Sequence, residues 1–126
     1  MRGLLVEDLL PEFAGCRLVN DLAPPTAGPD EVQVRICAAA LGFPDFLMSQ
    51  GGYQHKPELP FTLGTEMAGE ITALGENVTQ FKVGDAVVGG SLGGGLAEIG
   101  VFPATNLRKI PQSMNFAVAA ATGSAY

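Results

Sequence analysis

The stretch Leu41–Gly69, LGFPDFLMSQGGYQHKPELPFTLGTEMAG, divides into a short helix, an extended loop and the start of a strand. Pro44–Gln50 is the predicted helix, because proline is tolerated in a first turn, where its missing N–H has no helical partner in any case. A glycine pair follows at once, and glycine readily takes the left-handed conformation that ends a helix. Prolines then favour an extended loop over Tyr53–Leu63, and a strand is predicted at Glu66–Leu74.

Outside this stretch, the chain consists mainly of short apolar runs separated by turns rich in glycine and proline. The clearest run is Glu31–Leu41, EVQVRICAAAL, in which valine and isoleucine alternate with more polar residues, as in a strand with one buried face. Many short strands at short spacing are typical of a small β-barrel or sandwich, so the predicted fold class is mainly β. Further strands are predicted at Arg2–Glu7, Cys16–Asp21, Ala86–Gly89, Leu96–Phe102 and Leu107–Ile110.

From Met114 onward the sequence becomes rich in alanine, MNFAVAAATGSAY, and a helix is predicted that Ser113 or Asn115 caps. A helix that leaves a barrel without an evident stop signal looks like the start of another domain. We therefore expect residues 1–113 to form one domain and residues 114–126 to begin a linker helix to a second domain. The 126 residues leave room for only one ordinary domain.

The charge and apolar content narrow the classes of partner. The net charge is −6, and the seven lysine and arginine residues form no cluster, so neither nucleic acid nor an anionic membrane is an expected partner. The N-terminus carries Glu7 and Asp8 inside an apolar stretch, which does not fit a signal peptide, and a cytoplasmic location is expected. Apolar residues make up 47% of the chain. Either many small residues or a face for a partner domain accounts for this value.

The chain has few side chains that could bind a transition metal or act as a nucleophile. Cys16, Cys37 and His55 are the only cysteines and histidine, and their spacing matches no zinc motif, so no metal site is expected. The cysteines are predicted to be reduced, buried and inert. The glycine-rich run 89–95 is predicted to be a barrel turn, because a strand rather than a helix follows it. No GxGxxG motif lies between a strand and a helix, so the chain has no dinucleotide-binding fold of its own.

Six short motifs follow one another along the chain: GFPD at 42–45, GGY at 51–53, LPFTLGTEMAG at 59–69, FKVGDAV at 81–87, GGLAE at 94–98 and VFPA at 101–104. In this order they resemble the catalytic domain of the medium-chain dehydrogenase/reductase superfamily. The AAA at 119–121 is similar to the opening of that superfamily's linker helix. The resemblance implies a GroES-like β-barrel that forms one wall of a cleft, with a Rossmann domain carrying NAD(P)H as the other wall.

The departures from the superfamily pattern concern zinc. Zinc-dependent members place a cysteine where this chain has Gly42 and a histidine where it has Thr65. Their structural-zinc lobe, with four cysteines, would lie between Val88 and Ala97, where this chain has none. The chain therefore resembles the zinc-free quinone oxidoreductase and enoyl reductase branch. Quinone reductases of this type often carry asparagine at the position of Gly42.

This resemblance implies hydride transfer to a quinone or an α,β-unsaturated carbonyl, because without a metal no Lewis acid can polarise an alcohol oxygen. NADPH, or NADH, would be bound mainly by a domain that this chain lacks, so the chain alone is expected to be inactive. The expected partners are a small carbonyl or quinone substrate and the chain's own Rossmann domain. Family members commonly form homodimers, largely through that domain.

The resemblance also assigns candidate roles to residues. Tyr53 either donates a hydrogen bond or a proton to the acceptor oxygen or is a packing residue, and the hydroxyl of Thr65 is expected to contact nicotinamide or substrate. Phe43 and Leu47 are either apolar lining of the cleft or plain core. The residues expected along the cleft are Gly42, Phe43, Leu47, Thr122 and Tyr126, and those expected to be structural are Asp45, Glu66 and Asp85.

A second hypothesis is a non-enzymatic GroES-like domain that binds another protein. The missing cofactor domain and the glycine at position 42 favour it. Stable, monodisperse behaviour of the chain by itself would support this hypothesis, whereas exposed apolar surface would support a catalytic domain separated from its partner domain.

Overall fold

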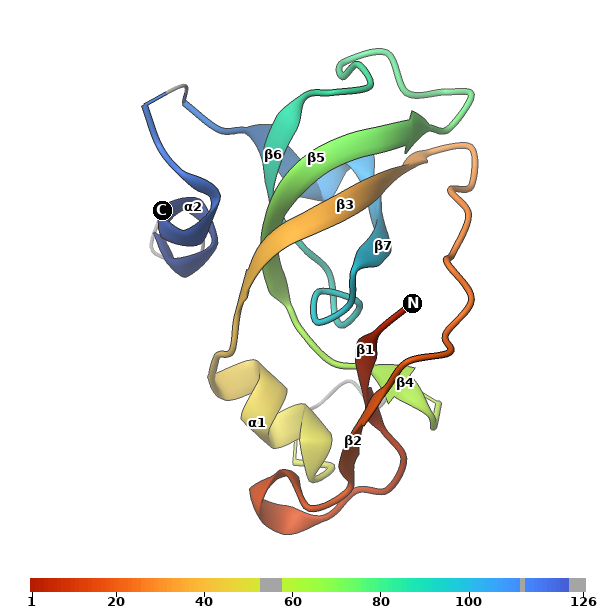
Figure 1. Cartoon of the computed structure of the whole chain (residues 1–126), viewed down its shortest axis with the longest axis vertical. Helices are drawn as coiled ribbons and strands as arrows, with labels where there is room; N and C mark the ends of the chain where they lie inside the picture. The colour runs from red at the N-terminus through yellow and green to blue at the C-terminus, as the bar shows by residue number, and fades with distance from the viewer. Residues whose placement is uncertain (53–57, 112, 123–126) are drawn as a thin grey trace.

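The computed structural model describes residues 1–52, 58–111 and 113–122, and it is dominated by two antiparallel sheets (Figure 1). The larger sheet has the strand order β7-β3-β5-β6-β8, and the smaller has the order β2-β1-β4. The strands are β1 Gly3–Val6, β2 Cys16–Val19, β3 Glu31–Ala40, β4 Phe61–Thr62, β5 Glu66–Leu74, β6 Ala86–Gly89, β7 Ile99–Pro103 and β8 Leu107–Lys109. The helices are α1 Phe43–Ser49 and α2 Phe116–Thr122, and the 3₁₀ turns are η1 Pro11–Phe13 and η2 Ala104–Asn106.

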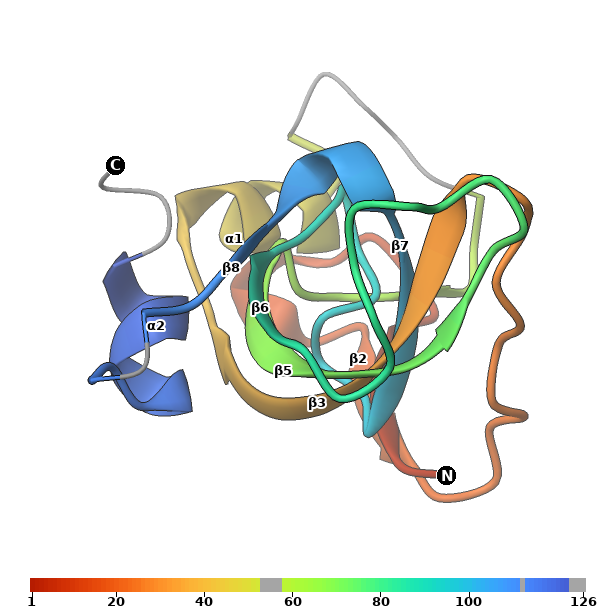
Figure 2. The same ribbon diagram turned by 90° about the horizontal axis from the view of Figure 1, so that it is seen from above.

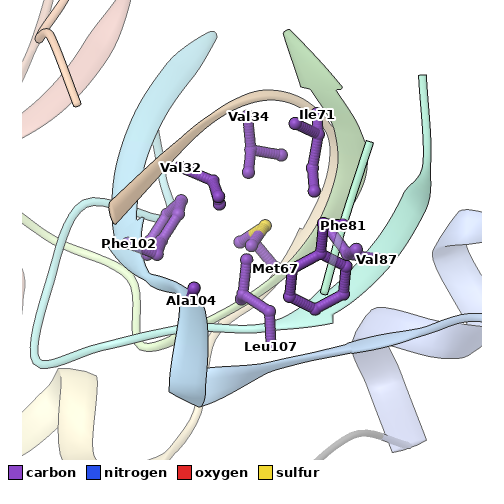
Figure 3. Close-up of a cluster of buried hydrophobic side chains, with 9 residues drawn as sticks. All are labelled: Val32, Val34, Met67, Ile71, Phe81, Val87, Phe102, Ala104 and Leu107. Atoms are coloured by element: carbon purple, nitrogen blue, oxygen red, sulfur yellow. The ribbon is translucent and has the colours of Figure 1, made fainter. Parts of the chain in front are cut away.

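The larger sheet curls into a barrel, as the view from above shows (Figure 2), and an apolar cluster fills its interior. Alternate residues of each strand point inward, which is the period of two that the alternating β3 sequence predicts. Register shifts at Gln33/Val34 and Ile36/Ala38 let β3 bend as it crosses β5. The inward side chains are Val32, Val34, Met67, Ile71, Phe81, Val87, Phe102, Ala104 and Leu107 (Figure 3).

The smaller sheet holds α1 in place below the barrel (Figure 1). Val6 of β1, Met48 of α1 and Leu63 form a second buried cluster, which fixes the helix against the sheet. A backbone bond from the Leu63 N–H to the Leu4 carbonyl extends the pairing of β4 with β1. Residues 61–63, which lead toward β5, are thereby attached to the smaller sheet.

Helix α2 covers part of the outer face of the barrel, where it packs against β3, β5 and β6. Ala119 and Ala120 contact Ala68 and Val88, so small side chains allow a close approach of helix and sheet. The Asn115 side chain accepts a hydrogen bond from the Val118 N–H at 2.8 Å and caps the helix. Within the described residues, neither α-helix has the length or hydropathy to cross a membrane.

The prediction of a mainly β fold is confirmed, and β5 and β6 have the predicted bounds. Strand β4 lies inside the predicted extended loop, because only its pairing with β1 makes it a strand. Strand β7 begins at Ile99 rather than Leu96, since Ala97 instead forms an isolated bridge with Gly3. The prediction of buried cysteines is wrong for Cys37, which is exposed. Cys16 is half-buried, and burial raises the pKa of its thiol.

Candidate functional site

Four strand ends meet at one edge of the larger sheet, close to α1. Neighbouring antiparallel strands run in opposite directions, so the end of β3 lies beside the start of β5, and the end of β6 lies beside the start of β8. The register pairs Ala40 with Glu66, Met67 with Gly89, and Gly89 with Leu107. This arrangement brings the 42–45 and 59–69 motifs to the same place as the glycine-rich turn.

Asp45 joins the 42–45 motif to the 59–69 motif. Its carboxylate is fully buried in α1 and accepts a hydrogen bond from the Gly42 N–H at 2.8 Å and from the Gly64 N–H at 3.1 Å. The Thr65 hydroxyl donates to the same carboxylate at 3.4 Å. A buried carboxylate needs such donors, because desolvation without them is costly. Asp45 therefore sets the distance between the residues that stand at the zinc-ligand positions of the superfamily.

The glycine-rich turn is hydrogen-bonded to the 59–69 motif. The Gly95 N–H donates to the Gly64 carbonyl and the Leu96 N–H donates to the Leu63 carbonyl, at 2.9 and 2.8 Å. Gly64 has a φ of +109°, and a Cβ there would lie 2.5 Å from the Leu96 nitrogen. Only glycine fits this position, so the approach of the two loops depends on it. The run 89–95 is a barrel turn that leads into β7, as predicted.

A polar cavity of about 660 Å³ lies among these segments. This volume falls within the roughly 300–1,000 Å³ of pockets that hold small molecules. Gly90 allows the turn to approach the start of β5 closely, because a Cβ there would lie 1.9 Å from the Thr65 carbonyl oxygen. The cavity is lined by Thr65, Glu66, Gly89, Gly90, Ser91, Leu92, Asn106 and Arg108.

Glu66 is half-buried at the wall of this cavity. Burial raises the pKa of its carboxyl, the charge of Arg108 acts in the opposite direction, and the charge of Asp45 adds to the rise. The two carboxylates and the guanidinium are therefore close enough to influence one another. Asn106 donates through its side-chain amide to the Gly90 carbonyl at 3.0 Å and holds the turn from the other side.

The remaining cleft candidates lie near the same edge or outside the described residues. Gly42 is exposed, Leu47 is half-buried, and Phe43 is 70% exposed and stacks on Phe46 with ring centroids 6.3 Å apart. Phe43 is thus a surface residue rather than core. Thr122 is the last residue of α2. Tyr53 and Tyr126 lie outside the described residues.

Asp85 lies away from the cavity, in the turn before β6. Its carboxylate accepts the Lys82 N–H at 2.9 Å, which stabilises the turn. The Lys109 ammonium lies 3.8 Å from the same carboxylate.

Ser91, Asn106 and Arg108 line the cavity but were not predicted as site residues. Asn106 and Arg108 reach the cavity only through the pairing of β8 with β6, which is not visible in local sequence. The one available signal was the pair Gly89 and Gly90, which marks a close backbone approach at a strand end.

The residues at the zinc-ligand positions do not fit a metal ion. Gly42 has no side-chain donor, and the Thr65 hydroxyl is directed to Asp45. Within residues 1–52, 58–111 and 113–122, no group of three or more histidine, cysteine or acidic side chains could hold a metal. No step of the chemistry is therefore assigned to zinc.

Comparison with known proteins identifies the family. Residues 28–112 match the model of the alcohol dehydrogenase GroES-like domain. A quinone oxidoreductase-like protein 2 homolog from Nematostella vectensis is 45% identical over 100 residues, which are 79% of this chain and 27% of that protein. Human quinone oxidoreductase is 34% identical over 119 residues, which are 91% of this chain and 36% of that protein. The chain thus spans roughly a quarter to a third of the length of these relatives.

Solved structures agree with this result. The quinone oxidoreductase of Pseudomonas syringae superposes with a TM-score of 0.87 at 38% identity, over 95% of this chain and 36% of that one. The Escherichia coli quinone oxidoreductase complexed with NADPH gives a TM-score of 0.86 at 26% identity, over 97% of this chain and 37% of that one. The barrel, the ordered motifs and these matches together show that the chain belongs to the alcohol dehydrogenase GroES-like domain family of the medium-chain dehydrogenase/reductase superfamily.

Proposed function

We propose that this chain is the catalytic domain of a zinc-independent, NAD(P)H-dependent oxidoreductase that reduces a quinone or an α,β-unsaturated carbonyl. The observation that carries the proposal is the polar cavity at the strand ends, which Thr65 lines. Thr65 and Gly42, at the zinc-ligand positions, offer no ligand set for a metal. Relatives named as quinone oxidoreductases support it. The expected location remains cytoplasmic.

The cofactor would be held mainly by a domain outside this chain, and NADPH is the first choice because the Escherichia coli relative was solved with it. When bound, the dihydronicotinamide supplies a hydride. This chain's own residues would bind and orient the acceptor. Asp45 fixes the Gly42 and Thr65 segments, and Thr65 lines the cavity.

The test compares the 126-residue chain with a longer protein in which it is followed by its dinucleotide-binding domain. We expect the longer protein to oxidise NADPH in the presence of 1,4-benzoquinone or an enone, with no loss of rate after treatment with a metal chelator. The chain alone should give no turnover. A longer protein that binds NADPH but reduces no quinone or enone would refute the proposal and favour the non-enzymatic interaction domain.

A further inference from the structure

We propose that Arg108 binds the oxygen of the acceptor and stabilises the negative charge that develops on it during reduction. This inference rests on the proposed function, and it adds a catalytic residue to it. Arg108 belongs to β8 and lies outside the six sequence motifs. Three features support this role: the register of the strands, the close packing of the turn after β6, and the distribution of charge.

The strand register places Arg108 on the outer face of the barrel. Val88 pairs with both Ala68 and Arg108, and a chain neighbour of each of these three residues, Met67, Val87 and Leu107, points into the core (Figure 3). Because side chains alternate along a strand, Arg108 and Glu66 lie on the face that carries α2. Helix α2 covers Ala68 and Val88, whereas Glu66 and Arg108 line the open cavity.

The turn after β6 lines the cavity between Glu66 and Arg108. Gly90 lies between the two strands that carry them and packs its backbone closely on Thr65, since a Cβ at Gly90 would lie 1.9 Å from the Thr65 carbonyl oxygen. The Asn106 side-chain amide donates to the Gly90 carbonyl at 3.0 Å and holds the turn in this position. A ring-sized acceptor that enters the cavity would meet both Arg108 and Thr65, which line it.

The charged side chains around the cavity indicate which kind of ligand atom Arg108 would bind. Among the described residues that line the cavity, Arg108 is the only one with a positive charge. The Asp45 carboxylate already accepts three hydrogen bonds, and Glu66 interacts electrostatically with Arg108 across the cavity. A guanidinium stays protonated at all ordinary pH values, so it donates hydrogen bonds to an oxyanion without giving up its proton.

The chemistry of the reduction requires such a group. As hydride adds to the acceptor carbon, the displaced π electrons move to the carbonyl oxygen, which becomes an enolate or a hydroquinone monoanion. The cofactor is oxidised by two electrons, and a proton from water completes the product. A positioned donor at the oxygen stabilises this charge, and removing one such donor from an enzyme typically costs about 10²–10³ in rate. Arg108 is exposed, so solvent lessens its effect here.

The test uses the 126-residue chain and needs no cofactor. Binding of 4-nitrophenolate, which carries an oxyanion on a ring, is compared with binding of the neutral 4-nitroanisole by isothermal calorimetry. The wild-type chain should prefer the phenolate, and Arg108→Gln should lower phenolate affinity by about tenfold while leaving the anisole unchanged, as expected for one charge-assisted hydrogen bond. Arg108→Lys should keep part of the preference.

Arg35→Gln is the matched control. Arg35 is also exposed in the larger sheet and is ion-paired with Glu70, so its loss changes the net charge equally without touching the cavity. Circular dichroism confirms that each variant is folded. The proposal is wrong if the wild-type chain shows no phenolate preference, or if Arg108→Gln and Arg35→Gln weaken binding equally.

The two proposals fail separately. A phenolate preference that depends on Arg108, in a longer protein that reduces no quinone or enone, would refute the proposed function and leave an oxyanion site. A longer protein that reduces a quinone equally fast with arginine or glutamine at position 108 would refute the role of Arg108 and leave the function.

Discussion

At the scale of single residues, Asp45 has the greatest influence on the geometry of the site. Three donors converge on its carboxylate, and the carboxylate is fully buried. Asparagine has nearly the same shape, but its NH₂ group would face one of these donors. We expect Asp45→Asn to lower the free energy of unfolding by about 1–3 kcal/mol, the usual result of leaving buried polar groups unpaired. Urea denaturation of the wild type and the variant measures this difference in the free energy of unfolding.

Asp30→Asn is the control for this prediction. Asp30 is exposed and accepts one hydrogen bond from the Asn77 side chain. Surface substitutions of this kind usually stay within about 0.5 kcal/mol. Equal effects of the two substitutions would mean that the Asp45 carboxylate does not organise the site.

Glu66 gives a pH-dependent prediction. Burial raises its pKa above the ordinary value of 4.5, so the folded protein binds this proton more tightly than the unfolded chain does. This contribution to stability is complete below the unfolded pKa and is lost as the pH rises through the folded pKa. The Glu66→Gln variant has no carboxyl group at this position, so it does not lose this stability as the pH rises. We therefore expect the variant to melt above the wild type at neutral pH, with the gap closing as the pH falls below about 4.5.

The opposite sign is expected at Glu7. The Arg17 side chain hydrogen-bonds the Glu7 carboxylate and lowers its pKa, so this contribution is present at neutral pH and lost as the pH falls through the lowered pKa. Glu7→Gln should melt below the wild type at neutral pH. Melting temperatures of both variants across the acid range test the two predictions together. If the two variants differ from the wild type in the same direction at neutral pH, the opposite pKa shifts of Glu66 and Glu7 are wrong.

At the scale of elements, the loop before β5 and the loop before β7 form one unit through Gly64. A methyl group there would meet the Leu96 nitrogen, and the backbone has a positive φ. Gly84 also has a positive φ, of +96°, but no atom lies within 4 Å of its ideal Cβ. Gly84→Ala therefore measures the cost of conformation alone, about 1 kcal/mol. Gly64→Ala adds the steric conflict, so we expect a clearly larger loss of stability in urea; similar losses would mean that the loops can separate freely.

The limits of prediction from sequence also lie at this scale. Strands β5 and β6 could be bounded in advance, because their apolar runs and flanking glycines are local signals. The two-residue strand β4 could not, since it exists only through its pairing with β1. Arg108 could not be predicted either, because it reaches the cavity only through the pairing of β8 with β6. Thr65 could be placed at the site only because a family motif marks its position.

At the scale of the whole molecule, α1 and α2 lie on the same side of the barrel (Figure 1). Apolar side chains at and just before α1 are exposed. Leu41 is 60% exposed and Phe43 is 70% exposed. If a cofactor domain follows in a longer protein, we expect it to cover this surface, because neighbouring exposed apolar residues are unfavourable in water. The 126-residue chain should then bind a fluorescent hydrophobic dye more strongly than the longer protein does.

Phe43→Gln should reduce dye binding by the 126-residue chain and leave that of the longer protein unchanged. Val83→Gln is the matched control: Val83 is 63% exposed, yet it lies in the β5–β6 loop, at the opposite end of the barrel from α1. Its replacement should lower the dye signal of both proteins by a similar, small amount, since no covering is expected there. If Phe43→Gln lowers dye binding equally in both proteins, Phe43 stays in solvent in the longer protein, and the face near α1 is free for another partner.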